Sequence, residues 1–241
     1  MPVKTFLLII ALGLLISKAI AQNALPDSTA YSEAAKQVIV HYNFVVDDQS
    51  EFYNGNEYHL YSPAHSGSAY FQDKPILTPS IVRYNGIWYR NVPVLYDRYA
   101  DVMVSSLRDS LYLLRPDKTS DIYLLGHHFI YLYNGAEKNL APGFYDQLYS
   151  GKSEILVKRN TTVQNTVTQQ TVEVNYENSD IIYIKKGGTY VQVNSKRSVL
   201  DVFKDKNKEL KQYLNSSKIS YKKDKEQSIA KLASYYDQLT K

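Results

Sequence analysis

Residues 80–97 constrain the fold of this chain more than any other stretch, because they have the pattern of a β-hairpin. Two runs rich in β-branched and aromatic residues flank Asn85 and Gly86, and both of these residues tolerate the positive φ of a two-residue type I′ turn. Such a turn fixes which residues lie opposite each other. The expected pairs are Tyr84 with Ile87, Arg83 with Trp88, Val82 with Tyr89 and Ile81 with Arg90.

Side chains alternate between the two faces of a strand, so the hairpin has one face for a core and one that is more polar. The residues expected to pack on the core are Val82, Tyr84, Ile87 and Tyr89. The opposite face carries Ile81, Arg83, Trp88 and Arg90, which predicts a cation–π contact between Arg83 and Trp88. A flat Trp between two arginines is alternatively a platform for a sugar or a protein partner. Arg83, Trp88 and Arg90 are therefore the candidate ligand-binding residues.

The N-terminus has the features of a secretory signal peptide. Lys4 precedes an apolar run over residues 6–16, and an Ala-x-Ala site ends at Ala21, so cleavage is expected after Ala21. The run is too short to span a bilayer comfortably, and no later stretch is apolar enough for a transmembrane helix. No Cys follows the cleavage site, which excludes a lipoprotein. The sequence predicts an exported mature protein, periplasmic or extracellular.

Two features of the composition bear on function. The absence of Cys excludes thiol catalysis and thiolate metal sites, and it disfavours a small disulfide-framed module. The 23 Tyr residues suit half-buried strands, because the ring packs while the hydroxyl reaches water or a carbonyl. Tyr-rich surfaces also bind glycans and proteins. Composition leaves both interpretations open.

Charge is distributed unevenly along the chain. Residues 22–194 contain 14 basic and 18 acidic side chains, whereas residues 195–241 contain 12 basic and 6 acidic ones. A solvated helical face explains the basic end most simply. Docking of this end to an acidic surface, such as an anionic envelope polymer or lipid headgroups, is the alternative. Export and the acidic body argue against a nucleic-acid partner.

Strand candidates follow the hairpin at a spacing of about ten residues, which is typical of an antiparallel sheet. They lie at residues 102–105, 111–114, 122–125 and 128–133, with later ones at 144–149 and 155–159. The polar run at residues 160–170 is expected to be a mobile loop or a protruding hairpin tip. Residues 181–193 predict a second hairpin around Gly187 and Gly188.

The pattern becomes helical after residue 194. Ser195 or Ser198 is the expected cap of a first helix, and Asp205 and Asp224 are expected to begin two more. One apolar stripe on the last helix consists of Ile229, Leu232, Ala233, Tyr236 and Leu239. The predicted class is α+β, with a mainly antiparallel β body, a sandwich or barrel-like sheet, followed by two to three helices. We expect three parts: a signal peptide (1–21), a β-rich body (22–194) and a basic helical segment packed on it (195–241).

Catalytic signals are weak. The five histidines, His41, His59, His65, His127 and His128, show no metal-binding spacing, and adjacent residues on a strand face opposite ways. No nucleophile elbow, phosphate-binding loop or zinc-protease motif is present, so no metal or cofactor is predicted. Asp97 and Asp101 are the best carboxylate pair, next to an aromatic hairpin as in a glycosidase cleft. Two acids four residues apart around a turn are more often turn-forming residues.

Six motifs are spread over nearly the whole expected mature chain. They are Tyr53-Asn54-Gly55-x-Glu57-Tyr58, Tyr84-Asn85-Gly86-x-x-Tyr89-x-Asn91-Val92-Pro93-Val94-Leu95-Tyr96-Asp97, Gly126-His127-His128-Phe129, Gly143-Phe144-Tyr145-Asp146-x-Leu148-Tyr149-x-Gly151-Lys152, Ser195-Lys196-Arg197-Ser198-x-Leu200 and Tyr235-Tyr236-Asp237-Gln238-Leu239. In these motifs the chain resembles a widespread family of uncharacterised exported proteins of Gram-negative bacteria, which has no assigned activity. The resemblance implies export and a β-rich body with a helical tail, and it assigns no functional residues.

These observations favour a binding protein over an enzyme. The first hypothesis is a non-catalytic envelope protein that binds a glycan or a protein partner through its aromatic sheet face, with the basic helices as a docking element. The alternative is a hydrolase that acts on envelope polysaccharide or peptidoglycan through Asp97 and Asp101.

Overall fold

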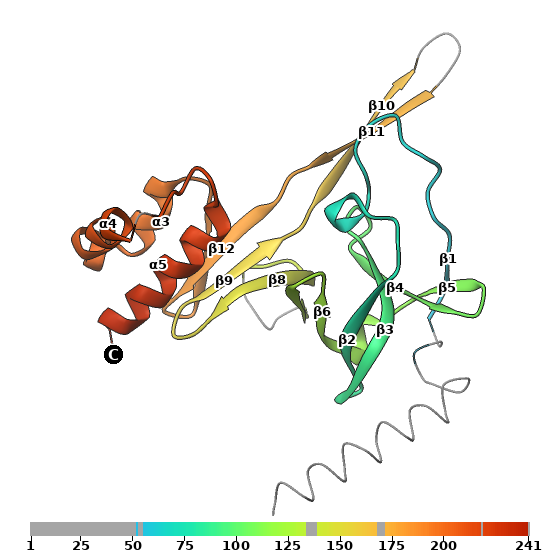
Figure 1. Cartoon of the computed structure of the whole chain (residues 1–241), viewed down its shortest axis with the longest axis horizontal. Coiled ribbons are helices and arrows are strands. Elements are labelled where there is room, and N and C mark those ends of the chain that lie inside the picture. Colours follow the sequence, from blue (N-terminus) through green and yellow to red (C-terminus); the bar gives the residue numbers. More distant parts are fainter. Residues whose placement is uncertain (1–51, 53–54, 134–138, 168–171, 218, 241) are drawn as a thin grey trace, which may run out of the picture. The chain divides into compact units, whose positions relative to one another are not determined.

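The computed structural model describes residue 52 and residues 55–133, 139–167, 172–217 and 219–240 (Figure 1). The predicted signal peptide lies outside the described residues. No helix within these ranges is long and apolar enough to cross a membrane.

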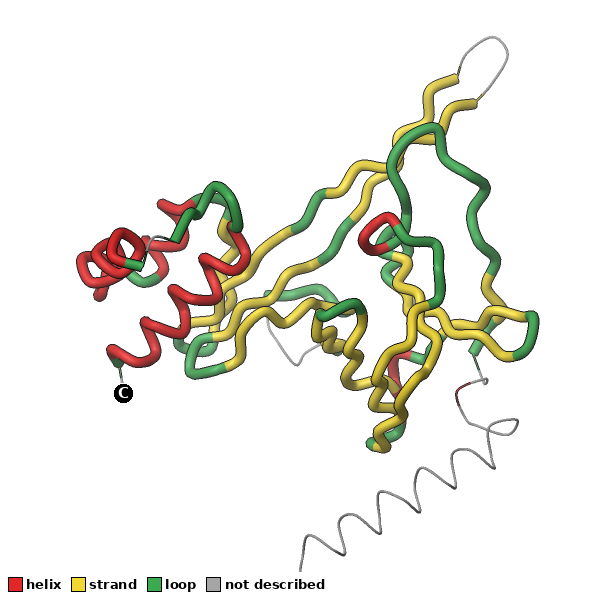
Figure 2. Tube along the Cα trace, in the orientation of Figure 1, coloured by secondary structure: helices red, strands yellow, loops and turns green. Residues whose placement is uncertain are grey.

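Strands are the main secondary structure of the described chain, and three helices follow them (Figure 2). The strands are β1 (Glu57–Tyr58), β2 (Thr78–Tyr84), β3 (Ile87–Asp97), β4 (Val102–Leu107), β5 (Ser110–Leu113), β6 (Thr119–Leu124), β7 (His127–Leu132), β8 (Gly143–Ser150), β9 (Glu154–Lys158), β10 (Thr161–Val167), β11 (Val172–Asn178), β12 (Ile181–Lys186) and β13 (Thr189–Val193). The helices are α3 (Lys196–Val202), α4 (Asn207–Ser216) and α5 (Lys225–Leu239), with short 3-10 turns η3 (Phe71–Asp73), η4 (Pro116–Lys118) and η5 (Lys204–Lys206).

Eleven of the described strands form one open antiparallel sheet in the order β1-β5-β4-β3-β2-β6-β7-β8-β9-β12-β13. Strands β2 to β5 form one meander and strands β6 to β9 form another, and the two meet where β2 pairs with β6. Strands β10 and β11 form a separate two-stranded ribbon. The predicted α+β class is confirmed, and the β body takes the form of an open sheet instead of a sandwich or a closed barrel.

The β2–β3 hairpin has the predicted turn. Asn85 and Gly86 have φ angles of 48° and 78°, and three of the four expected cross-strand pairs form, from Tyr84–Ile87 to Val82–Tyr89. The predicted pairing of Ile81 with Arg90 is wrong, because the register shifts between Ser80 and Val82. The opposing strand contains Asn91 at a φ of 58°, and an extra residue in this left-handed conformation produces a bulge.

One face of the sheet, the inner face, carries most of the core. Val82, Ile122, Phe129, Asp146, Val157 and Ile182 follow one another in register across the strands on this face, and all are buried. Trp88 and Tyr123 lie on the opposite, outer face. The expectation that Ile87 packs on the core is wrong, since it is 44% exposed. It directly follows the turn, where Asn85 and Gly86 are exposed as well.

The three helices pack on the inner face at the β9, β12 and β13 end of the sheet, where they share one core with Ile155 and Ile184 (Figure 1). Ser195 caps α3 in a capping box with Ser198, and Asp224 caps α5. The sequence predicts both of these helix caps. The predicted start of a helix at Asp205 is wrong, because Asp205 lies in η5 and α4 begins at Asn207. Four of the five residues of the predicted apolar stripe of α5 are buried, namely Ile229, Leu232, Ala233 and Tyr236.

The polar run at residues 160–170 contains a strand. Residues 161–167 form β10, which pairs along its whole length with β11, and residues 168–170 lie outside the described part. Five of the seven β10 residues are Thr or Val, whose branched side chains favour extended backbone. The predicted second hairpin also forms, as β12 and β13 around Gly187 and Gly188.

Candidate functional site

A row of three aromatic rings on the outer face is the strongest candidate for a binding surface. The rings of Trp88 on β3 and Tyr123 on β6 have centroids 6.0 Å apart, and Tyr123 stacks on His128 of β7 at 4.4 Å with an interplanar angle of 8°. Trp88 is 43% exposed and Tyr123 is 46% exposed. We call Trp88, Tyr123 and His128 the ring row.

Strand pairing explains why these residues meet. Arg83 of β2 lies opposite Trp88 on one side and opposite Asp121 of β6 on the other. Tyr123 shares the face of Asp121, two residues earlier on the same strand, and lies opposite His128. The ring row therefore crosses from β3 over β2 and β6 to β7.

Charged groups flank the ring row. The guanidinium carbon of Arg83 lies 5.7 Å from the centroid of the Trp88 ring, which confirms the predicted cation–π contact. Arg83 Nη1 is 3.8 Å from Asp121 Oδ2, and His128 Nε2 donates a hydrogen bond of 3.0 Å to Asp121 Oδ1. A cation and a carboxylate thus lie beside half-exposed aromatic faces. This combination can bind a polar ligand with apolar ring faces.

Arg90, the third predicted ligand-binding residue, is not part of this cluster. It is exposed and immediately precedes Asn91 in the bulge. Within the described ranges it makes no ion pair and no ring contact. Its role in binding stays a prediction.

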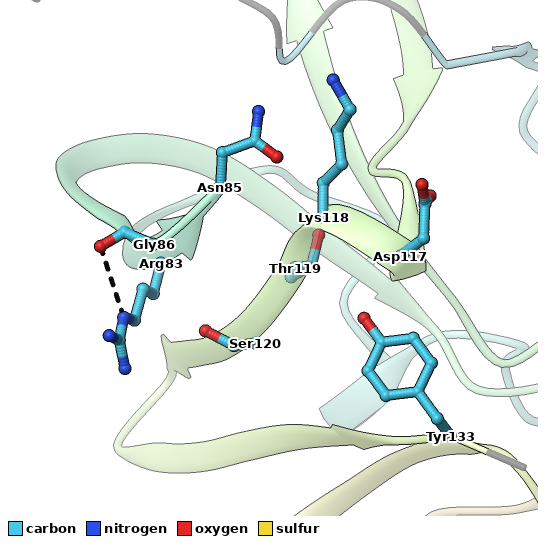
Figure 3. A pocket seen from close by; sticks show the side chains of 8 residues that line it. All are labelled: Arg83, Asn85, Gly86, Asp117, Lys118, Thr119, Ser120 and Tyr133. Carbon is cyan, nitrogen blue, oxygen red and sulfur yellow. Dashed lines mark hydrogen bonds between the residues drawn. The ribbon is translucent and has the colours of Figure 1, made fainter.

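An open hollow of about 340 Å³ lies at the turn end of the β2–β3 hairpin (Figure 3). Its lining includes Arg83, Lys118, Ser120 and Tyr133. Figure 3 shows Arg83 turned toward the Gly86 carbonyl, to which Nε donates a bond of 3.5 Å. Arg83 contacts the Trp88 ring and also lines the hollow, so it is a residue that the ring row and the hollow share.

Asp97 organises a turn and a tyrosine cluster. Its carboxylate is fully buried and accepts hydrogen bonds of 2.8 Å from the hydroxyls of Tyr58 and Tyr61. The backbone N–H groups of Tyr99 and Ala100 donate to its other oxygen at 3.0 and 2.9 Å. Burial, together with hydrogen bonding and the charge of Asp97, raises the pKa of both tyrosine hydroxyls above the usual range. Asp97 thus has four donors within the protein.

Asp101 has a different set of partners. Its Oδ1 accepts a hydrogen bond of 2.7 Å from the Tyr96 hydroxyl, and its Oδ2 accepts one of 3.2 Å from the Phe144 N–H and pairs with Lys158. The structure thus binds Asp97 and Asp101 to separate donors, and neither lines the hollow described above. Although the two acids are close in the sequence, their carboxylates share no hydrogen-bond partner among these contacts and do not form a pair.

The burial of Asp101 leads to a prediction about pH. Burial raises the pKa of this carboxyl, and Lys158, Tyr96 and the Phe144 N–H offset the effect only in part. The Asp101 carboxyl therefore keeps its proton to a higher pH in the native state than in the unfolded chain, where its pKa has the ordinary value of 3.8. The resulting contribution to stability is fully present below pH 3.8 and is lost as the pH rises through the native pKa. We expect the wild type to lose stability relative to Asp101→Asn as the pH rises from about 4 to about 7. Urea unfolding of both proteins across this range measures the difference, and a constant difference would contradict the assignment.

A connected group of buried charges lies on the inner face. Arg159 Nε and His127 Nδ1 donate hydrogen bonds of 3.0 and 2.7 Å to the same oxygen of Asp146. Arg159 also binds Asp180 at 2.8 Å and Glu226 of α5 at 2.6 and 2.8 Å. His127 and His128 therefore face opposite sides of the sheet, as the sequence predicts. This network links the sheet to α5, and we call it the buried ion network.

Two further observations concern possible ligands. The described residues contain no group of three or more His, Cys, Asp or Glu side chains arranged to hold a metal ion. At the helical end, several exposed lysines have no acidic partner among the residues that the structure describes. These are Lys204, Lys208, Lys211, Lys222 and Lys223. Docking of this end to an acidic surface stays a prediction.

Comparison with protein families, with curated proteins and with solved structures gives no match to this chain. The candidate site therefore rests on its own geometry. Sequence reasoning finds Arg83 and Trp88 but misses Tyr123, Asp121 and His128, which complete the ring row and its charges. The alternation of Asp121 and Tyr123 along one strand is the signal that was available.

Proposed function

We propose that this chain is an exported envelope protein that binds a glycan along the ring row of its outer face. The observation that supports this proposal is the row of Trp88, Tyr123 and His128, in which the Trp88 and Tyr123 rings are half-exposed. The faces of sugar rings are rich in C–H groups and pack against aromatic faces, while their hydroxyls need polar partners at the edges. Aromatic rings beside charged groups meet both needs.

The position of the row favours a polymer over a small enclosed molecule. The rings follow one another across neighbouring strands, so they present a strip and not a closed cavity. Arg83 connects this strip to the hollow, where Lys118, Ser120 and Tyr133 supply further polar groups. A glycan chain lying on the rings can place a substituent in the hollow.

The alternative of hydrolysis through Asp97 and Asp101 has no comparable support. Asp97 is buried and accepts hydrogen bonds from four donors. Asp101 is paired with Lys158. Neither carboxylate lies beside the ring row or the hollow.

Replacing Trp88 with Ala is expected to weaken glycan binding about 30-fold, because loss of a central aromatic anchor costs roughly 2 kcal/mol or more. Tyr123→Ala is expected to have a similar effect, since Tyr123 contacts both other rings. Isothermal titration calorimetry with soluble peptidoglycan fragments and envelope polysaccharides measures the affinities. In the wild type, the fluorescence of Trp88, the single Trp of the chain, reports directly on contact with the row.

Tyr99→Ala is the matched control. Tyr99 is 43% exposed, as is Trp88, but it packs with Tyr61 and Tyr176 in a separate cluster. We expect this variant to bind as the wild type does. A glycan that binds equally well to the wild type, Trp88→Ala and Tyr123→Ala would contradict the proposal, as would binding of a protein partner alone through these rings.

A further inference from the structure

Within the described residues, the ribbon of β10 and β11 has an unpaired strand edge that takes no part in the proposed glycan site. Figure 1 shows this ribbon continuing from β9 and β12, away from the helices. The pairing runs from Thr161–Asn178 to Val167–Val172 and is antiparallel throughout. All β10 residues from Gln164 onward are exposed, and Val167 is 76% exposed.

Hydrogen bonds show which backbone groups of the ribbon point outward. On the far edge of β11, Tyr176 N–H donates to Ser66 C=O at 3.0 Å, and Val174 C=O accepts from His65 N–H at 2.8 Å. Residues 174 and 176 therefore bond away from β10, and residues 173, 175 and 177 bond toward it. Because residue 163 lies opposite 176 and residue 165 opposite 174, the backbone groups of Val163, Asn165 and Val167 point out from the free edge of β10.

The sequence of this edge does nothing to prevent pairing with another strand. Natural edge strands are protected by charged residues, Pro or bulges. Residues 160–172 contain no charged residue, no His, no Pro and no Gly, and the β10–β11 register has no bulge. A two-stranded ribbon is also only marginally stable by itself. On one edge, Asn175 of β11 already forms an isolated parallel bridge with Ser66, and in the part of the chain that the structure describes no strand pairs with the other edge.

We propose that β10 pairs antiparallel with β10 of a second copy of this chain. A second copy fits because an uncharged strand brings no like charges face to face when it pairs with itself. Thr161 is buried, so the outward residues available are Val163, Asn165 and Val167. A register centred on Asn165 pairs Asn165 with its own symmetry mate and Val163 with Val167, which uses all three.

Assembly through this edge stops at two copies. The far edge of β11 is occupied at Val174 and Tyr176 by the segment at His65 and Ser66. A symmetric contact between two β10 edges is self-complementary and leaves no open edge of the same kind for a third copy. The contact is small compared with stable interfaces, so the dimer forms at high concentration.

The chain has no Cys, which allows a direct test of the register. In Asn165→Cys the new thiols face each other across the symmetric pair, at the Cα separation of about 5.5 Å that suits a disulfide. We expect mild oxidation to convert this variant to a covalent dimer much faster than Lys231→Cys, whose exposed residue lies on α5. Equal rates for the two variants would overturn the proposal.

Sedimentation velocity over a concentration series tests the contact without cross-linking. The mass of the wild type is expected to rise toward that of a dimer, and Asn165→Lys is expected to weaken association at least tenfold, because it places two positive charges opposite each other. Residue 165 is exposed, so thermal unfolding of the variant should match that of the wild type. A wild type that stays monomeric throughout, or that forms polymers beyond the dimer, would contradict the inference.

Discussion

Replacing Arg159 with Met is expected to lower the free energy of unfolding by about 3–5 kcal/mol, the usual cost of leaving a buried charge without its partner. Asp146 is 1% exposed and Arg159 is 5% exposed, so water cannot solvate either charge when its partner is removed. Burial lowers the pKa of Arg159, but hydrogen bonds and charge from Glu226 and Asp146 more than reverse this effect. The charged form of Arg159 is thus held by its partners. Urea unfolding followed by circular dichroism measures the loss.

Arg115→Met provides a control for loss of an arginine charge. Arg115 pairs with Asp117 on the surface, where solvent screens both groups, and we expect no resolvable change in stability. A double variant, Arg159→Met with Asp146→Leu, is expected to recover part of the loss, because it removes the unpaired carboxylate as well. If Arg159→Met is as stable as the wild type, the buried ion network does not hold α5 to the sheet.

Replacing Phe203 with Ala is the second change with a large expected effect, a loss of about 3–5 kcal/mol. Phe203 is fully buried, stacks on Tyr236 of α5 at 4.4 Å and lies in the core that helices and strands share. Removing the ring leaves a cavity that its neighbours in this core cannot all relax to fill. Because the core is shared, we expect the unfolding transition to stay single while its midpoint moves to lower urea concentration.

Trp88→Ala is the matched aromatic control for Phe203→Ala. Its ring is 43% exposed, so its removal leaves no enclosed cavity and should change stability far less. Two separate transitions in Phe203→Ala would show that the helices unfold independently of the sheet, contrary to the shared core. Fluorescence and circular dichroism recorded on the same samples distinguish these outcomes.

Local signals in the sequence account for the elements that were predicted correctly. Asn85 and Gly86 specify a turn by their own backbone preferences, and Ser195 and Asp224 specify helix starts by their side-chain hydrogen bonds. The pairing of Ile81 with Arg90 fails because the register depends on a bulge. Asn tolerates the left-handed conformation found at residue 91, but nothing in the sequence requires it.

Only part of the candidate site could be predicted from the sequence, because the rest depends on pairing between strands that are distant in the chain. Arg83 and Trp88 lie in one hairpin, so a two-residue turn brings them together. Tyr123 joins them only because β2 pairs with β6, and no local pattern identifies β6 as that neighbour. The buried ion network is less predictable still, since Arg159 and Glu226 are 67 residues apart in the chain.

The ring row is carried by paired strands and not by loops, which has a consequence for the thermodynamics of binding. Tyr123 is paired through its strand on both sides and is stacked on His128, so its rotamers are already restricted before a ligand arrives. Ordering a free side chain at an interface costs about 0.5–1.5 kcal/mol. Here that entropic cost is met when the protein folds, so the surface is pre-organised for the proposed glycan.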